Sequence, residues 1–137
     1  VCAVITWPDN FELQDPNTIP RMAEEAREQA RLVAALRCHW SNLTTENRPI
    51  VFAVPNGGKR NAAEAANLKV QGALAGVHDL IIWLPGGRSL LVEMKAADGR
   101  LSDSQKAIQN HAKALGFASF VAYSAEDALN QLRGITE

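Results

Sequence analysis

The sequence predicts an α/β sandwich, in which a central mixed β-sheet is covered by helices on both faces. Short apolar runs alternate along the chain with segments of helical periodicity, and two of these runs flank a Pro-Gly-Gly turn at residues 85–87. The chain has 137 residues, 47% of them hydrophobic, and no internal repeat. We therefore expect one folded domain at residues 21–137, preceded by a leader at residues 1–20 that contains a short strand and an irregular segment.

A first helix is predicted at residues 21–40, directly after Pro20. Glu25 borders its apolar face, whereas Glu24 and Glu28 are expected to be solvated. The positions that form this face step by three or four residues and are Met22, Ala26, Gln29, Val33, Leu36 and Trp40.

A capping-box pattern at Ser102 and Gln105 predicts a helix that continues to about Leu115 and stops at Gly116. We expect the three tryptophans to pack in the core. The other predicted elements are a strand at 50–54, a loop at 55–60, a helix at 61–70, the hairpin strands between Asp79 and Lys95, a strand at 117–123 and a helix at 125–133.

Composition excludes several classes of protein. The net charge is −1, so any binding to nucleic acid must come from a local cluster of Lys and Arg. No apolar stretch is long enough for a membrane span, and residues 1–7 are too short for a secretory signal. Cys2 and Cys38 lack the spacing of a zinc site, and a cytoplasmic protein is expected.

The predicted hairpin carries three charged residues that apolar strands rarely tolerate. Glu93 and Lys95 lie two apart on one strand and therefore share a face of the sheet. Asp79 joins them only if it pairs opposite Glu93, which requires a connecting loop with an odd number of residues, or a bulge. The sequence thus ties a chemical hypothesis to the length of one turn.

Two carboxylates held close together repel each other, and a Mg²⁺ or Mn²⁺ ion between them removes that cost. The Met94 carbonyl lies beside the same face and is a further candidate ligand, with Glu25 as a fourth, directly or through water. Lys95 could orient the attacking water or stabilise charge on a phosphate. The alternative is structural: Asp79 begins a strand, and Glu93 and Lys95 form a solvated strand edge.

Six ordered motifs resemble those of the VRR-NUC domain family, which belongs to the PD-(D/E)xK nuclease superfamily. The likeness runs from about Glu25 to Leu132. The motifs are Val54-Pro55-Asn56-Gly57-Gly58, Leu68-Lys69, Gly76-Val77-His78-Asp79-Leu80, Val92-Glu93-Met94-Lys95, Gly99-x-Leu101-Ser102-x-x-Gln105 and Leu115-Gly116-Phe117.

The resemblance implies a restriction-endonuclease-like α/β/α sandwich and a set of roles. Asp79 and Glu93 would be metal ligands, Lys95 the catalytic lysine and Glu25 a supporting carboxylate. Gln105 would also belong to the site, although its capping-box role is an equal alternative and one side chain cannot easily do both. The family usually has proline before the aspartate, where this chain has His78, which we interpret as a tolerated neighbour.

Candidate DNA contacts are the cations around this site, and ordinary solvated charges are the alternative for each. They are Lys59 and Arg60 after a Gly-Gly loop, and Lys69, Arg100 and Lys106 on a basic rim.

These residues predict a Mg²⁺- or Mn²⁺-dependent deoxyribonuclease. The resemblance further implies 5′-phosphate products, branched DNA such as Holliday junctions or flaps as substrate, and a homodimer. Two other hypotheses stay open: a non-catalytic nucleic-acid-binding module on the same fold, and a structural or partner-binding domain. Uptake of Mg²⁺ or Mn²⁺ would argue against the first, and tight salt-dependent DNA binding against the second.

Overall fold

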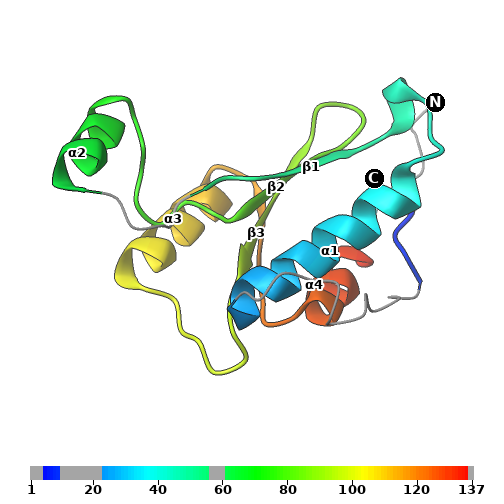
Figure 1. The fold of residues 1–137 in the computed structure, drawn as a ribbon. Helices are drawn as coiled ribbons and strands as arrows, with labels where there is room; N and C mark the ends of the chain where they lie inside the picture. The colour runs from blue at the N-terminus through cyan, green and yellow to red at the C-terminus, as the bar shows by residue number, and fades with distance from the viewer. Residues whose placement is uncertain (1–4, 10–22, 56–60, 136–137) are drawn as a thin grey trace.

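The computed structural model of the chain describes residues 5–9, 23–55 and 61–135 (Figure 1). It confirms the predicted α/β class, and the observed elements match the predicted ones within a few residues. In chain order these are α1 (Glu24–Trp40), a 3₁₀ turn (Thr45–Asn47), β1 (Ile50–Ala53), α2 (Ala62–Val70), β2 (Leu80–Trp83), β3 (Ser89–Met94), α3 (Asp103–Ala114), β4 (Ala118–Ala122) and α4 (Ala125–Leu132).

The four strands form one mixed sheet in the order β1-β2-β3-β4. β1 pairs antiparallel with β2, and β2 with β3, whereas β3 and β4 run parallel. The parallel step requires a crossover, which α3 supplies between the two strands. The chain therefore reaches β4 only after passing over one face of the sheet.

Helices α1 and α4 pack together against one face of the sheet, and α3 packs against β4 (Figure 1). The buried core lies between the sheet and the pair α1 and α4. It contains Leu32, Leu36 and Trp40 from α1, Leu80, Ile82, Leu90, Val92 and Met94 from the hairpin, and Leu129 and Leu132 from α4. Helix α2 stands apart from the sheet, and nearly all of its residues are exposed (Figure 1).

Side-chain caps define the starts of three helices. Asn61, Ser102 and Ser124 each accept a hydrogen bond from the backbone N–H three residues later. The capping box predicted at Ser102 and Gln105 is present in full. These local signals explain why the predicted starts of α2, α3 and α4 lie within one residue of the observed starts.

Helix α1 differs from its prediction at Glu28, while residues 21 and 22, where the predicted helix begins, lie outside the described residues. The prediction that Glu28 is solvated is wrong: it is 6% exposed. One carboxylate oxygen accepts from the Ala125 N–H at the start of α4, 3.2 Å away, and the other pairs with Arg31. Glu28 thus joins two helices, because a carboxylate satisfies unpaired N–H groups at a helix N-terminus.

The tryptophans divide between the core and the surface. Trp7 and Trp40 are buried and pack edge to face with ring centroids 5.5 Å apart, as predicted. Residues 5–7 do not form the expected strand, although Trp7 joins the core. Trp83 is 51% exposed and packs beside Phe52, so the prediction of core packing is wrong for this residue. It lies on the sheet face opposite α1 and α4, since Leu80 and Ile82 of the same strand point into the core.

Candidate functional site

The hairpin register brings Asp79 opposite Glu93. Within β2 and β3, Leu80 pairs with Val92 and Trp83 with Ser89, and the same register continued by one residue joins Asp79 to Glu93. The Leu84 N–H donates to the Arg88 carbonyl at 2.8 Å, which leaves the three-residue turn 85–87. The predicted loop of odd length is therefore confirmed, and both carboxylates lie on one face.

The two carboxyl groups interact closely. Asp79 Oδ2 accepts a hydrogen bond from the Met94 N–H at 2.8 Å, which fixes the aspartate against β3. Glu93 is 3% exposed. Its pKa is raised from the ordinary 4.5 to about 8, first by burial, then by the negative charge of Asp79 and by a hydrogen bond between the two carboxyl groups. Near neutral pH without a cation, the pair therefore holds a proton.

Gln105 has both of the roles that the sequence left as alternatives. Its Oε1 accepts from the Ser102 N–H at 2.8 Å and completes the capping box, while its Nε2 donates to Glu93 Oε1 at 2.8 Å. The expectation that one side chain could not easily do both is wrong, because an amide has an acceptor at one end and donors at the other. Gln105 thereby couples the start of α3 to the carboxylate pair.

Lys95 and Glu25 complete the charged cluster. The Lys95 ammonium lowers the pKa of Glu93, and the Glu25 carboxylate raises it, so both charges act on the pair. Among the described residues, no three His, Cys, Asp or Glu side chains are grouped so that they alone could hold a metal ion. An ion here would thus rely on Asp79, Glu93 and non-carboxylate oxygens, of which the Met94 carbonyl and water are candidates. The direct role of Glu25 as a ligand stays a prediction.

His78 occupies a structured position next to Asp79. It is 4% exposed, and its Nε2 lies 2.6 Å from Ser119 Oγ on β4. Burial lowers its pKa below the ordinary 6.5; the Asp79 charge opposes this shift and the Lys113 charge reinforces it. The contact with Ser119 links the start of β2 to β4 across the sheet.

The predicted DNA contacts are dispersed. Lys69 on α2, Arg100 in the loop after β3 and Lys106 on α3 are exposed, and Lys59 and Arg60 lie outside the described residues. Sequence reasoning missed Lys113, whose charge reaches His78. Its spacing of seven residues from Lys106 is the signal that could have found it, because positions seven apart share a helix face.

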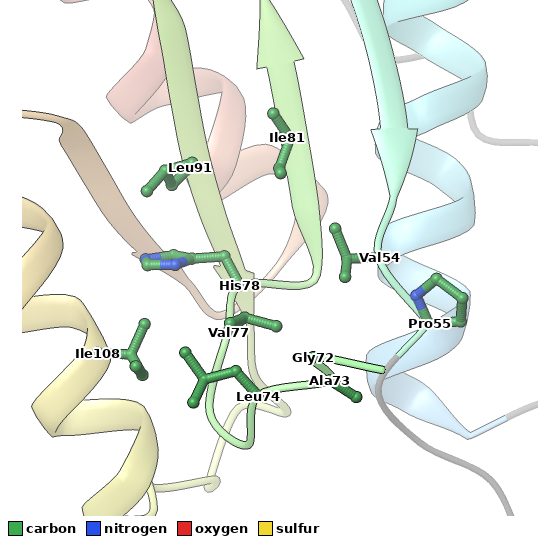
Figure 2. Close-up of a pocket in the computed structure, with 10 residues that line it drawn as sticks. All are labelled: Val54, Pro55, Gly72, Ala73, Leu74, Val77, His78, Ile81, Leu91 and Ile108. Carbon is green, nitrogen blue, oxygen red and sulfur yellow. The ribbon is translucent and has the colours of Figure 1, made fainter. Parts of the chain in front are cut away.

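A pocket of about 400 Å³, which the sequence did not predict, lies beside the carboxylates on the same face of the sheet (Figure 2). Ile81 and Leu91, which pair across β2 and β3, form its floor. Ile108 of α3 and Leu74 of the loop before β2 are on one side of the view, Val54 and Pro55 are on the other, and the His78 ring points between Leu91 and Ile108 (Figure 2). Two elements far apart in sequence thus border one hollow next to the site.

Comparisons with known proteins identify the family and agree with the fold. The profile of the VRR-NUC domain matches residues 15–126. A solved structure described as a VRR_NUC domain protein superposes with a TM-score of 0.61 at 20% sequence identity, covering 82% of this chain and 88% of the other, which shows a shared fold. The search of curated proteins gives no match. Because the profile spans most of the sequence, the chain belongs to the VRR-NUC domain family, a family of nuclease-type domains.

Proposed function

We propose that this protein is a Mg²⁺- or Mn²⁺-dependent deoxyribonuclease that hydrolyses phosphodiester bonds in branched DNA. The observation that carries the proposal is the hydrogen-bonded pair of Asp79 and the buried Glu93, with Lys95 beside it. A structural role would not need two carboxyl groups in contact, since the arrangement raises the pKa of Glu93 and stores repulsion. A divalent cation would relieve that repulsion, so the residues present fit such an ion.

Each side chain then has a distinct task. Asp79, Glu93 and the Met94 carbonyl would hold the cation, and Glu25 would add negative charge nearby. When bound, Mg²⁺ or Mn²⁺ supplies a Lewis acid and positive charge for the phosphate. The Lys95 ammonium would orient the attacking water and stabilise the charge that develops on the phosphate oxygens, leaving a 5′-phosphate product.

Gln105 and the backbone position the carboxylates. Because the Gln105 amide donates to Glu93, it directs the carboxylate toward Asp79 and stabilises its charged form. The Met94 N–H donates to Asp79 and fixes its carboxylate against β3. Both donors belong to regular elements or their caps, so the two ligands are held before substrate binds.

A homodimer is the form in which we expect the protein to act on a junction. Two copies related by a twofold axis would present two equivalent sites to the two equivalent strands of a four-way junction. With a net charge of −1, the interaction with DNA would depend on local cations, for which Lys69, Arg100, Lys106 and, in the sequence, Lys59 and Arg60 are candidates.

The test is cleavage of an end-labelled four-way junction and of a linear duplex with the same arms, with Mg²⁺, Mn²⁺ or EDTA. Wild-type protein should cut the junction only with metal, and Lys95→Ala or Asp79→Asn should slow cleavage by about 10²- to 10⁴-fold. Glu46→Gln is the matched control, because it also removes one carboxylate charge. Glu46 is exposed in the 3₁₀ turn after α1, whereas Glu25 of the site lies near the start of α1, at its other end. Cleavage by Lys95→Ala at the wild-type rate would refute the assignment.

The same assay separates the second candidate, a nucleic-acid-binding module without catalysis. That module would bind the junction in a gel-shift experiment and leave it intact with every metal. The raised pKa of Glu93 favours the enzyme over this candidate, because a binding surface gains nothing from a buried carboxyl group held against a second one.

A further inference from the structure

The pocket lies next to the candidate site along β2 and β3. Its floor residue Ile81 lies two positions after Asp79, and Leu91 lies two positions before Glu93. Residues two apart on a strand point to the same face and are separated by roughly 7 Å. If a DNA phosphate lies at the carboxylates, the sugar or base attached to it, or that of the neighbouring nucleotide, would therefore lie over the pocket.

The chemistry of the lining restricts what can enter. Of the ten described residues that line the pocket, none is Lys, Arg, Asp or Glu, and His78 has the only polar side chain. A phosphate is a poor occupant, because an anion buried without a cation is strongly unfavourable. Leu74, Ile81, Leu91 and Ile108 suit a flat, neutral group with apolar faces, and the His78 ring borders them while its Nε2 contacts Ser119.

We propose that the pocket receives a single unpaired nucleobase adjacent to the cleaved phosphate, held between the sheet floor and α3. The volume of about 400 Å³ is within the range of small-molecule sites and accommodates a base with part of its sugar. Enzymes that draw a base out of a stack hold it between apolar or aromatic side chains in this way. The pocket would favour DNA whose bases are already unpaired, as they are at a junction or flap, because unstacking then costs least.

This inference rests on the proposed nuclease function and names the substrate feature that the same site selects. Leu74 makes it testable without harm to the fold, because Leu74 is 55% exposed and lies in a loop. Val70 provides a matched control: it is 88% exposed, lies four residues earlier at the end of α2 and does not line the pocket. Leu74→Glu and Val70→Glu add the same charge in neighbouring places.

The experiment uses two readouts on one junction. First, cleavage by the wild-type protein with Mg²⁺ locates the cut. Second, 2-aminopurine replaces one base at a time around that cut. If no cut occurs, the replacements are made around the branch point. Each labelled junction is titrated with the Lys95→Ala protein, which keeps both carboxylates, and the 2-aminopurine fluorescence is recorded. We expect the fluorescence to change at one position, and an abasic site at that position to reduce wild-type kcat/KM by about tenfold or more, as for lost base contacts elsewhere.

The variants assign that signal to the pocket. Leu74→Glu in the Lys95→Ala background should abolish the position-specific fluorescence change, and Val70→Glu should retain it. Cleavage without any position-specific signal, or a signal that Leu74→Glu leaves unchanged, overturns the pocket proposal while the nuclease function stands. A signal lost only with Leu74→Glu, in a protein that cuts no DNA, supports the nucleobase pocket and refutes the nuclease. If Leu74→Glu changes only the oligomeric state, the pocket belongs to a protein interface and the proposal is wrong.

Discussion

The two faces of the β2–β3 hairpin differ sharply, although their residues alternate along the same two strands. On one face Leu80, Ile82 and Leu90 are fully buried against α1 and α4. On the other, Asp79 and Glu93 form a carboxyl pair at one end, and the floor of an open pocket follows them. The period of two in a strand thus separates a face that stabilises the fold from a face that carries chemistry.

This division explains how the domain tolerates an unfavourable site. The packed face contributes hydrophobic burial, at about 25 cal/mol for each Å² removed from water. The carboxyl pair works against folding, because burial and mutual repulsion both disfavour its charged form. Substitutions on the two faces should therefore affect different measurements.

The largest loss of stability should come from substitution of a leucine on the packed face, and the adjacent leucine on the other face provides the comparison. Leu90 is fully buried, whereas Leu91 is partly exposed at the floor of the pocket. We expect Leu90→Ala to lower the free energy of unfolding by about 2–5 kcal/mol and Leu91→Ala by about 1 kcal/mol. Urea denaturation followed by circular dichroism measures both, and equal losses would contradict the division between the faces.

An intermediate effect is expected at Gly76, which lets the loop before β2 approach α3. Its φ is +87°, and an added Cβ would lie 2.5 Å from the Ser104 carbonyl and 2.8 Å from the Gln105 nitrogen. Gly72 has φ +106° but open space around it. Gly72→Ala should therefore cost only the backbone strain of about 1–2 kcal/mol, and Gly76→Ala more than that.

The pair of glycine variants also tests the link to the site. Because the clash in Gly76→Ala falls on the turn that holds Gln105, cleavage should fall more with Gly76→Ala than with Gly72→Ala, where Gly72 lines the pocket but has open space around it. Both variants are compared at a temperature where circular dichroism shows each to be folded. Equal activity in the two would mean that the position of Gln105 does not matter.

The smallest effect on stability should be a gain, from Glu93→Gln without metal. The folded pKa of about 8 is above the ordinary 4.5, so the protonated form favours folding below pH 4.5 and this contribution disappears as pH rises through 8. Gln at this position cannot ionise and should be more stable than wild type by about 1 kcal/mol or more near pH 8, since one pKa unit corresponds to about 1.4 kcal/mol. The same variant should not cleave DNA.

Thermal melts in EDTA across this pH range measure the gain. Glu46→Gln, which removes an exposed carboxylate and keeps Glu93, should follow the wild-type curve and show no gain in stability near pH 8. Addition of Mn²⁺ should stabilise wild type and leave Glu93→Gln unchanged, because only the charged pair would bind the ion. A wild-type curve that is flat from pH 5 to 8 would argue against the raised pKa.

Local patterns predicted most of this fold. The caps at Ser102 and Ser124 and the turn at residues 85–87 involve residues close in sequence, so the helix starts and the hairpin register followed from them. The convergence of Asp79 with Glu93 depended on that register alone. The number of residues in one turn was therefore enough to predict that the two carboxylates share a face.

Features that depend on distant partners were missed. Glu28 is buried because its carboxylate meets the start of α4, 97 residues away in sequence, which no helical periodicity can reveal. The two roles of Gln105 required the position of β3 relative to α3. The pocket arises where α3 and the loop before β2 meet the sheet, so neither its place nor its volume follows from one segment.

The most direct test of the central claim is a crystal structure grown with Mn²⁺, in which anomalous scattering locates the ion. The account predicts one Mn²⁺ between the Asp79 and Glu93 carboxylates, in contact with the Met94 carbonyl and with Lys95 nearby, and none at that place in Asp79→Asn crystals. An ion bound elsewhere, or a carboxyl pair that stays metal-free at saturating Mn²⁺, would contradict the claim that this face of the hairpin is a metal centre.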